Sequence, residues 1–339
     1  MVNKVYSQKK LSLKPYNTFN IDVQANDFIK IQTEEELINA LQQFPNPFIL
    51  GGGSNMLLTQ NIEKPVFHIQ LKGIFIEKET EDFVWIKAQA GENWHKFVLH
   101  TLNQGFGGLE NLSLIPGNVG TTPIQNIGAY GIEIKDVMEN CEAIHVKTYK
   151  KKTFSNADCK FAYRESIFKN EEKDNYIITS VTFKLTKRNH TLHTEYGAIK
   201  DVLSQKEIKN PTPKDISEAV IFIRESKLPD PKKIGNSGSF FKNPIVTKMK
   251  FEKLQEKYPK MPFYELNQEQ VKIPAGWLID TCKLKGYRKG DAGVHKKQAL
   301  VLVNYGNATG TEILEIAHFV KNEVKEKFDI ELEFEVNIF

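Results

Sequence analysis

The chain has 339 residues, of which 40% are hydrophobic and 26% charged, and its formal net charge is +4. This length exceeds what one small core organises and predicts two or three domains. The positive excess is small and scattered, so it does not favour a nucleic-acid-binding protein. The longest apolar runs, AVIFI and ALVLV, are too short to span a membrane.

The cysteine content points to a reducing compartment. Cys141, Cys159 and Cys282 show no CxxC spacing, and an odd number argues against a disulfide framework. Reduced thiols in a cytosol are the simpler interpretation. The opening residues contain no apolar run, so no secretory signal is expected. We therefore expect a cytoplasmic protein.

The first half of the chain alternates strand and helix patterns. The segment 23–33 reads as a strand leading into a helix, because Thr33 and Glu36 form a capping-box pattern ahead of EEELINALQQF. A short apolar strand at 47–50 runs into GGGSN. Further elements are expected as strands at 66–70, 83–90, 137–148 and 176–186 and as a helix at 92–103.

The sequence pattern changes near residue 205, where strand-like segments give way to a clear helical period. Thr212 is the expected N-cap of a helix whose first residue is Pro213. The order of elements predicts an α+β protein with a larger domain at 1–205 and a smaller one at 206–339. The later elements are an irregular segment at 227–244, a short buried helix at 275–282, a strand at 298–304, a helix at 310–327 and a final strand at 331–339.

The motif GGGSN, at 51–55, follows a predicted strand. Three consecutive glycines let the backbone approach a ligand closely and point amide N–H groups at it, which suits a pyrophosphate. The dinucleotide-binding fingerprint is absent, because Met56 stands where its third glycine belongs, and there is no GxxxxGK[ST] motif. A tight turn without a ligand is the alternative.

The stretch IPGNVGTTPIQNIGAYG, at 115–131, carries four glycines and lies within a longer uncharged segment, Asn111–Ile132. Lack of charge fits a buried site, because an unpaired buried charge is costly. A loop of this length without secondary structure is uncommon unless it is functional. We interpret it as a ligand-binding loop, with an internal structural loop as the alternative. Its neutral hydrogen-bonding side chains are Thr121, Thr122, Gln125 and Asn126.

The motif NSGSFF, at 236–241, places two serines in a glycine turn. No GxSxG elbow is present, so a hydrolase nucleophile is poorly supported. A serine there could still donate a proton if a neighbour tunes it, and a turn hydroxyl is the plain alternative. The aromatic residues Phe240, Phe241 and Trp277 are expected in the core.

The eight histidines show no metal-binding pattern. There is no HExxH motif, and neither His95 with His100 nor His190 with His193 has convincing ligand spacing. We therefore predict no metal.

Nine motifs in a fixed order resemble one known family, the UDP-N-acetylenolpyruvoylglucosamine reductase (MurB) family, over nearly the whole chain. They are NTF at 17–19, LGGGSN, AGENWH, GLENLSLIPGNVGTTPIQNIGAYG, FAYRESIF, KLPDP, GNSGSFFKNP, PAGWLID and LEFEV. The resemblance implies an FAD-binding domain of the vanillyl-alcohol-oxidase (PCMH) type, 1–205, made of two α+β subdomains that divide near residue 70. The smaller α+β domain, 206–339, would bind the UDP-sugar, and the last strand could return to the FAD domain.

Under this resemblance FAD is the cofactor, which supplies the redox chemistry while the protein positions it. The neutral loop at 115–131 would embrace the FAD, and GGGSN would hold its pyrophosphate through backbone amides. The implied FAD-binding residues are Leu50, Gly51, Gly52, Gly53, Ser54, Asn55, Pro116, Gly117, Gly120, Thr121, Thr122, Gln125, Asn126, Gly128, Ala129, Tyr130 and Gly131.

The reaction implied by the resemblance has two steps. NADPH gives hydride to the flavin, and UDP-N-acetylglucosamine enolpyruvate is then reduced to UDP-N-acetylmuramate for peptidoglycan synthesis. Hydride would reach C3 of the enolpyruvyl group, and Ser239 would protonate C2. Arg164 and Glu335 would stabilise the enolate-like intermediate at the substrate carboxylate, where charge develops.

Other matched positions imply substrate contacts. Tyr196, in EYGAI, resembles a tyrosine on a mobile loop that closes over the UDP moiety, and its presence indicates the longer, type I form of the family. The remaining implied substrate contacts are Tyr163, Lys227, Asn243 and Gln298.

Two of these assignments have competitors nearby in the sequence. Ser237 offers a second hydroxyl, although the motif selects Ser239. Strand alternation would place Glu331 and Glu333 on one face with Glu335, and a solvated strand edge is the alternative for the first two.

Two other functions stay open at this point. One is a flavoprotein of the same FAD fold with a different substrate, such as an alcohol oxidase, which GNSGSFFKNP and LEFEV argue against. The other is a non-catalytic nucleotide-binding module, which the joint presence of Arg164, Ser239 and Glu335 argues against. The expected partners are the small-molecule substrate and NADPH, without nucleic acid or membrane insertion. The oligomeric state is open, a monomer included.

Overall fold

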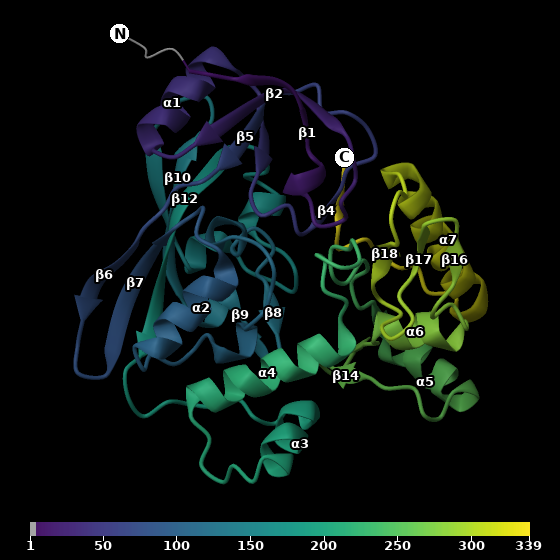
Figure 1. The fold of residues 1–339 in the computed structure, drawn as a ribbon. Helices are drawn as coiled ribbons and strands as arrows, with labels where there is room; N and C mark the ends of the chain where they lie inside the picture. Colours follow the sequence, from purple (N-terminus) through teal and green to yellow (C-terminus); the bar gives the residue numbers. More distant parts are fainter. Residues whose placement is uncertain (1–4) are drawn as a thin grey trace. The chain divides into compact units, whose positions relative to one another are not determined.

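The computed structural model describes residues 5–339. Residues 1–4, part of the stretch expected to lack a secretory signal, lie outside the described residues. Internal contacts divide the chain (Figure 1) into two compact units, described separately below. Unit 1 comprises the segment up to Leu11, Gln24–Gly52 and Ile62–Ser226, and unit 2 comprises Ser12–Val23, Gly53–Asn61 and Lys227–Phe339.

The first sheet of unit 1 has the strand order β1 (Gln8–Ser12), β2 (Gln24–Ile31), β5 (Val66–Ile69), β3 (Phe48–Leu50). Strand β5 runs parallel to both β2 and β3. The carboxyl ends of parallel strands share one edge of a sheet, which is where ligand-binding loops gather in such folds. GGGSN leaves β3 at that edge.

Helix α1 (Glu34–Gln43) lies beside this first sheet in Figure 1 and starts where the capping pattern predicts. The Thr33 hydroxyl accepts the Glu36 N–H at 3.0 Å. The Glu36 carboxylate reaches one residue further back than a capping box requires and accepts the Gln32 N–H at 2.7 Å. Buried Leu37 and Leu41 of α1 share a hydrophobic cluster with the strands of the sheet.

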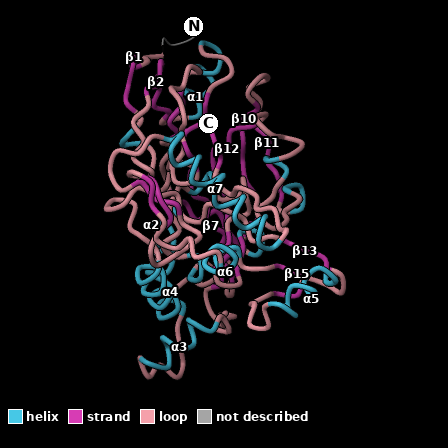
Figure 2. Tube along the Cα trace, turned by 90° about the vertical axis from the view of Figure 1, so that its right-hand side faces the viewer, coloured by secondary structure: helices cyan, strands magenta, loops and turns pink. Residues whose placement is uncertain are grey.

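The second sheet of unit 1 is antiparallel throughout. Its strand order is β11 (Lys151–Ser155), β10 (Met138–His145), β12 (Tyr176–Thr186), β7 (Phe83–Gln89), β6 (Ile74–Glu79), and Figure 2 shows several of these strands as one magenta layer. Helix α2 (Trp94–Asn103) packs on it through Trp94 and Phe97, whose ring centroids lie 5.7 and 5.2 Å from that of Phe183. The first sheet ends at Ile69 and the second begins at Ile74.

The remaining elements of unit 1 are a short hairpin and two helices. Strands β8 (Gly128–Ala129) and β9 (Ile132–Glu133) pair within the glycine-rich loop. Helices α3 (Gly197–Gln205) and α4 (Pro213–Lys227) share a hydrophobic cluster with Tyr130. The Thr212 hydroxyl accepts the Asp215 N–H at 3.3 Å, as an N-cap does. Because α4 packs here, the compact units divide after Ser226, beyond the change in sequence pattern near 205.

Unit 2 contains two small antiparallel sheets. One has the order β16 (Arg288–Lys289), β17 (Ala292–Val294), β18 (Leu302–Asn304), with α7 (Gly310–Phe328) and α6 (Ala275–Thr281) close by in Figure 1. The other has the order β13 (Ile245–Thr247), β15 (Gln270–Lys272), β14 (Tyr264–Glu265), next to α5 (Lys248–Lys257). Helix α7 opens with a full capping box between Thr309 and Glu312.

The end of the chain pairs with a segment from its beginning. Strand β19 (Asn337–Ile338) runs parallel to β4 (Met56–Leu57) within unit 2. The predicted strand at 331–339 is therefore too long, because the segment before Asn337 pairs as a strand only at Phe334, which forms an isolated bridge with Phe241. Phe240 and Phe241 are fully buried, as expected, whereas Trp277 is half-buried against Tyr258 and Phe328.

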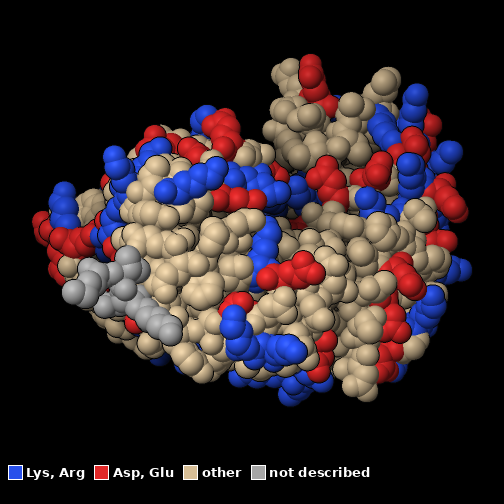
Figure 3. Space-filling view, turned by 90° about the horizontal axis from the view of Figure 1, so that it is seen from above, with Lys and Arg blue, Asp and Glu red and all other residues tan. Residues whose placement is uncertain are grey.

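Charges of both signs are interspersed over the face shown in Figure 3. Among residues 5–339, no helix is both long and apolar enough to cross a membrane.

Candidate functional site

Two glycine-rich segments of unit 1 lie against each other. A side-chain carbon added to Gly52 would lie 2.8 Å from the Cα of Gly117, and one added to Gly51 would lie 2.7 Å from the Cγ2 of Thr121. Only glycine allows two backbones to come this close. The fold therefore brings the predicted cofactor segments at 50–52 and 116–121 together, although they are far apart in the sequence.

The second of these segments is fastened to the second sheet. The Gly120 N–H donates to the Ala90 carbonyl at 3.0 Å, and a side chain on Gly120 would lie 2.4 Å from the Ala90 Cβ. The Trp94 N–H donates to the Gly117 carbonyl at 3.0 Å. Glycine at 120 is thus required by packing, whatever a ligand adds.

The two threonines of this segment hold its own turn. The Thr121 hydroxyl donates to the Asn118 carbonyl at 2.7 Å, and the buried Thr122 hydroxyl donates to the Val119 carbonyl at 2.8 Å. Their donor hydrogens are therefore used locally, and each keeps only lone pairs for another partner.

Asn126, also predicted to bind cofactor, is fully buried and bonded on both sides of its amide. Its Nδ2 donates to the Glu133 carboxylate at 2.9 Å and to the Ala162 carbonyl at 3.0 Å. Its Oδ1 accepts the Lys135 N–H at 3.0 Å. These bonds shape the loop from within, so the loop backbone is the better candidate for ligand contact.

Several residues with a Cβ adopt left-handed backbone conformations in and beside the loop. Such conformations cost energy for any residue but glycine, and they cluster at functional sites. The residues are Leu114, Asn126, Tyr130 and Arg164, with φ of 58°, 44°, 50° and 57°.

Arg164 lies against the hairpin of β8 and β9. Its Nη2 donates to the Gly128 carbonyl at 2.8 Å, and its guanidinium carbon lies 5.3 Å from the centre of the Tyr163 ring. Unit 1 thus brings the predicted catalytic Arg164 and substrate contact Tyr163 to the predicted cofactor loop.

Tyr130 and Tyr196 also meet in unit 1. Their ring centroids are 5.6 Å apart at an interplanar angle of 75°, and the Tyr196 side chain is 43% exposed. The Asn111 amide donates to the Tyr130 carbonyl at 3.0 Å and to the His193 carbonyl at 2.9 Å. One buried amide therefore connects the loop at 115–131, predicted to bind the cofactor, to the segment that carries Tyr196.

The residue that sequence reasoning missed is Arg224, on α4. Tyr130 packs against the cluster of α3 and α4, and its interaction with the guanidinium opposes the main effect, burial, which lowers the pKa of Arg224 and raises the pKa of Tyr130. The Arg224 Nε is buried and has no hydrogen-bond partner among residues 5–339. A buried cation with an unused donor is suited to an anionic ligand. The available signal was spacing: Arg224 precedes Lys227 by three residues, which puts both on one helix face.

In unit 2 the second half of GGGSN lies beside the predicted catalytic glutamate. The Asn55 amide donates to the Glu335 carbonyl at 3.2 Å, and the Glu335 N–H donates to the Phe240 carbonyl at 2.9 Å. Ser239, the residue before Phe240, is thus on the segment next to Glu335. Unit 2 brings Gly53–Asn55, Ser239 and Glu335 together.

The two serines of NSGSFF have different environments. Ser237 is buried, and its hydroxyl donates to the Met56 carbonyl at 3.1 Å and lies 3.3 Å from the Thr18 hydroxyl. Ser239 is half-buried, and its hydroxyl makes no hydrogen bond to any residue in the described part of the chain. The difference favours Ser239 as the hydroxyl available to a substrate.

The acidic residues near Glu335 also differ from it. The Glu331 and Glu333 side chains are 67% and 74% exposed and pair with Lys321 and Lys242 at 3.7 and 3.2 Å. Glu335 is half-buried. This matches the expected solvated edge for the first two.

Two predicted substrate contacts meet at the start of α6. The Asn243 Oδ1 accepts the Ala275 N–H at 2.9 Å, and a side chain on Gly276 would lie 3.3 Å from the Gln298 Oε1. Lys227 is exposed at the end of α4.

Comparison with known proteins assigns the chain to a family. A family model described as the C-terminal domain of UDP-N-acetylenolpyruvoylglucosamine reductase matches residues 230–339, and a model of an FAD binding domain matches residues 27–150. The UDP-N-acetylenolpyruvoylglucosamine reductase of Flavobacterium johnsoniae is 60% identical over 98% of this chain and 99% of its own length. The chain belongs to the UDP-N-acetylenolpyruvoylglucosamine reductase (MurB) family.

Two further comparisons agree with membership of the MurB family. The reductase of Chromobacterium violaceum is 49% identical over 95% of this chain and 96% of its own length. The crystal structure of MurB from Thermus caldophilus is 25% identical, has a TM-score of 0.67 and covers 99% of this chain and 100% of its own. The predicted family, the α+β fold with an FAD-binding domain, and an FAD-dependent oxidoreductase as the enzyme class are confirmed.

The glycine cradle of unit 1 fits the MurB cofactor. The matched FAD-binding region, 27–150, contains Gly51, Gly52 and Gly120, where added side chains would collide with Thr121, Gly117 and Ala90. The residue-by-residue assignments within the site stay predictions.

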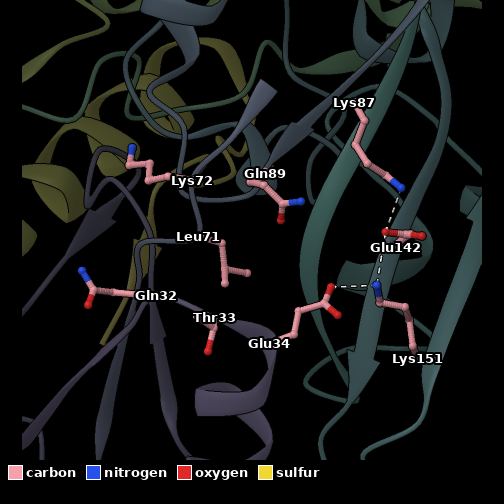
Figure 4. A pocket seen from close by; sticks show the side chains of 9 residues that line it. All are labelled: Gln32, Thr33, Glu34, Leu71, Lys72, Lys87, Gln89, Glu142 and Lys151. Carbon is pink, nitrogen blue, oxygen red and sulfur yellow. Dashed lines mark hydrogen bonds and ion pairs between the residues drawn. The ribbon is translucent and has the colours of Figure 1, made fainter. Parts of the chain in front are cut away.

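A separate polar cavity of about 380 Å³ in unit 1 contains none of the predicted site residues (Figure 4). Most of its charges pair with one another: Lys151 lies 2.8 Å from Glu34, and Glu142 lies 3.1 Å from Lys87 and 3.4 Å from Lys151. The remaining charge, on Lys72, pairs at 3.6 Å with Glu92 outside the lining. Self-paired charges leave little net attraction for a ligand, so we place no function there. It is lined by Gln32, Thr33, Glu34, Leu71, Lys72, Lys87, Gln89, Glu142 and Lys151.

No group of three or more His, Cys, Asp or Glu side chains suited to a metal ion occurs among residues 5–339.

Proposed function

We propose that this MurB family member reduces UDP-N-acetylglucosamine enolpyruvate to UDP-N-acetylmuramate with NADPH as the hydride donor. The observation that carries the proposal is the unbonded, half-buried Ser239 hydroxyl on the segment beside Glu335. A reductase of an enol ether needs a proton donor as well as a hydride source, and Ser239 has the required chemistry.

Bound FAD would accept hydride from NADPH and deliver it to C3 of the enolpyruvyl group. The backbone of Gly51–Asn55 would hold the pyrophosphate, and the backbone of Gly117–Thr121 would lie against the cofactor. Gly51 and Gly52 support this role, because the absence of side chains lets these residues lie against the segment 117–121. Arg224 would offer its unused Nε–H to an anionic group of a bound nucleotide.

Ser239 would donate its hydroxyl proton to C2 of the substrate as C3 receives the hydride. The double bond then gains one hydride and one proton, so electrons and atoms balance. The serine is left as an alkoxide, which recovers its proton from solvent. Ser237 is unsuited to this role because its own proton is given to the Met56 carbonyl.

Arg164 and Glu335 would stabilise charge at the substrate carboxylate during this proton transfer. The guanidinium of Arg164 is fixed by its bond to the Gly128 carbonyl, and a fixed donor loses little entropy when it binds a carboxylate. Glu335 is held through its backbone N–H and carbonyl, by Phe240 and Asn55.

The UDP-sugar would be bound by the substrate domain proposed for 206–339, with Lys227, Asn243 and Gln298 as contacts and with Tyr163 and Tyr196 from the FAD domain proposed for 1–205. Asn243 and Gln298 at the first turn of α6 support a shared role. We also propose that the enzyme acts in the cytoplasm on these two small-molecule substrates, without nucleic acid.

The test is an anaerobic visible spectrum of the purified protein as NADPH and then the enol ether are added. We expect a flavin band that NADPH bleaches and the enol ether restores, with one equivalent of UDP-N-acetylmuramate formed. A band that the enol ether cannot restore would keep the cofactor and reject the substrate. A protein that cannot be loaded with FAD would reject the whole proposal.

A further inference from the structure

The NTF turn, Asn17–Phe19, belongs to unit 2 and is one of the family motifs for which the proposed reaction gives no role. Asn17 builds the turn: its amide donates to the carbonyls of Leu13 and Ile21 at 2.8 and 2.9 Å, and its Oδ1 accepts the Ile21 N–H at 3.0 Å. All the hydrogen-bonding capacity of this amide except one lone pair is spent inside the turn. The turn therefore holds Thr18 and Phe19 in fixed positions, where both contact neighbouring segments of unit 2.

Thr18 contacts the second half of GGGSN. Its N–H donates to the Gly53 carbonyl at 3.0 Å, and its hydroxyl lies 3.3 Å from the same oxygen. Gly53 has a φ of +61°, and a side chain there would lie 2.0 Å from the Tyr16 carbonyl oxygen. The turn and the glycine loop therefore fit together only because residue 53 is glycine.

The same Thr18 hydroxyl contacts the loop that carries Ser239. It lies 3.3 Å from the Ser237 hydroxyl, which also donates to the Met56 carbonyl. The Thr18 hydroxyl thus lies within hydrogen-bonding distance of both the Ser237 hydroxyl and the Gly53 carbonyl, and either hydroxyl can donate in the Thr18–Ser237 contact. The Asn236 N–H adds a bond to the Thr18 carbonyl at 2.9 Å.

Phe19 fixes the other side of Ser239. Its ring is fully buried and meets the ring of Phe240 edge-on, with centroids 6.2 Å apart. Its carbonyl accepts the Asn304 amide at 2.9 Å. Consecutive residues of the turn thus hold Ser237, two positions before Ser239, and Phe240, one position after it.

We propose that Thr18 is a positioning residue for proton donation. Through one hydroxyl, Thr18 fixes the loop of Ser239 relative to the GGGSN segment at Gly53. Ser239 is thereby held at a set distance from the reacting carbon. The inference rests on the proposed function of Ser239. Thr18 itself touches neither substrate nor cofactor in this account.

The experiment compares Thr18→Val, which keeps the branched shape and removes the hydroxyl, with Thr18→Ser, which keeps the hydroxyl. Each FAD-loaded enzyme is reduced anaerobically by NADPH and then reoxidised by the enol ether in a stopped-flow spectrometer. Loss of one hydrogen bond in Thr18→Val is expected to slow reoxidation roughly fivefold, with reduction changed less than about twofold. Thr18→Ser is expected to retain the parent rate within about twofold.

Two added readouts separate positioning from a general loss of structure. The solvent isotope effect on reoxidation should rise in Thr18→Val, because proton transfer then limits the rate. In a Ser239→Ala background Thr18→Val should slow reoxidation no further, because effects that act through one group are not additive.

The inference is overturned if Thr18→Val reoxidises at the parent rate, if it slows both half-reactions equally, or if its effect adds fully to that of Ser239→Ala. These outcomes leave the proposed function intact as long as Ser239→Ala alone slows reoxidation. A parent-like rate for Ser239→Ala would instead reject Ser239 as the donor and, with it, the reason for positioning it.

Discussion

The loop at 115–131 in unit 1 and the loop at 235–241 in unit 2 differ in how they use their side-chain hydrogen-bond donors. In the first, Thr121, Thr122 and Asn126 spend their donors on the protein itself. In the second, the Ser237 hydroxyl donates to the protein in the same way, but the Ser239 hydroxyl makes no hydrogen bond to the described residues. A surface that binds a cofactor gains from a fixed backbone, whereas a group that gives up a proton must keep that proton uncommitted.

The strongest test of this contrast is Ser239→Ala against Ser237→Ala. We expect Ser239→Ala to reduce flavin with NADPH normally and to slow reoxidation by the enol ether by about a hundredfold, as for loss of a general acid. Ser237→Ala should cost about 1 kcal/mol of stability and leave reoxidation within about threefold of the parent. Rapid-reaction absorbance and thermal unfolding give both numbers, and equal effects of the two variants would erase the distinction between the loops.

A single added methyl group at Gly52 should disturb the packing of the GGGSN segment against the loop at 115–131. Gly52→Ala should destabilise unit 1 by about 1–3 kcal/mol and lower FAD retention, because the new carbon meets the backbone of Gly117. Gly51→Ala should do less, since it meets only the Thr121 methyl, and Gly51→Ala with Thr121→Ser should recover most of the loss. Flavin content after gel filtration and the melting temperature measure this. Failure of the double variant to recover would place the strain elsewhere.

Acid should lower the stability of unit 1 through His68 in strand β5, which pairs with β3 next to the GGGSN segment. Burial, with Lys30 and Lys72 nearby, lowers the pKa of His68 to about 4. The unfolded chain binds this proton more readily than the folded one, so stability present above about pH 6.5 is lost as pH falls to 4. We expect this loss to be about 1–2 kcal/mol, because the ring is partly exposed.

His68→Leu should remove that component of the pH dependence. The free energy of unfolding in urea, measured for parent and variant from pH 7.5 to 4, isolates it as the change in their difference. A difference that stays constant with pH would contradict the assignment.

The smallest effect is expected at Glu333, which shares the segment of Glu335. Glu333→Gln should change stability by less than about 0.5 kcal/mol and reoxidation by less than about twofold, since the Glu333 side chain is 74% exposed to solvent. Glu335→Gln, measured alongside, should slow reoxidation well beyond that. If the two variants behave alike, the burial difference between these carboxylates has no catalytic meaning.

The features that could be predicted from the sequence are those decided by residues close together in the chain. The starts of α1, α4 and α7 follow from Thr33, Thr212 and Thr309, because an N-cap is decided by residues within one turn. The cofactor loop stood out through its glycines and its lack of charge. Motif order then supplied the family, which the comparisons confirm.

The features that could not be predicted from the sequence depend on contacts between residues far apart in the chain. Arg224 becomes a candidate only where α4 packs against Tyr130, and its spacing from Lys227 gives the helix face but not that contact. The final strand was predicted over 331–339 because its pattern alternates, but only Asn337–Ile338 finds a neighbouring strand. The transfer of Ser12–Val23 and Gly53–Asn61 into unit 2 is equally invisible to local patterns.

The parallel pairing of β4 with β19 has a consequence for biosynthesis. Met56 and Leu57 leave the ribosome long before their partners Asn337 and Ile338 are synthesised. Most of unit 1 is one continuous stretch, Ile62–Ser226, and can complete its core while translation continues. The early segments of unit 2 must wait, with apolar side chains such as Phe19 and Leu57 still uncovered. Nascent chains stalled before residue 227 should therefore bind chaperones through these segments, and release should coincide with synthesis of β19.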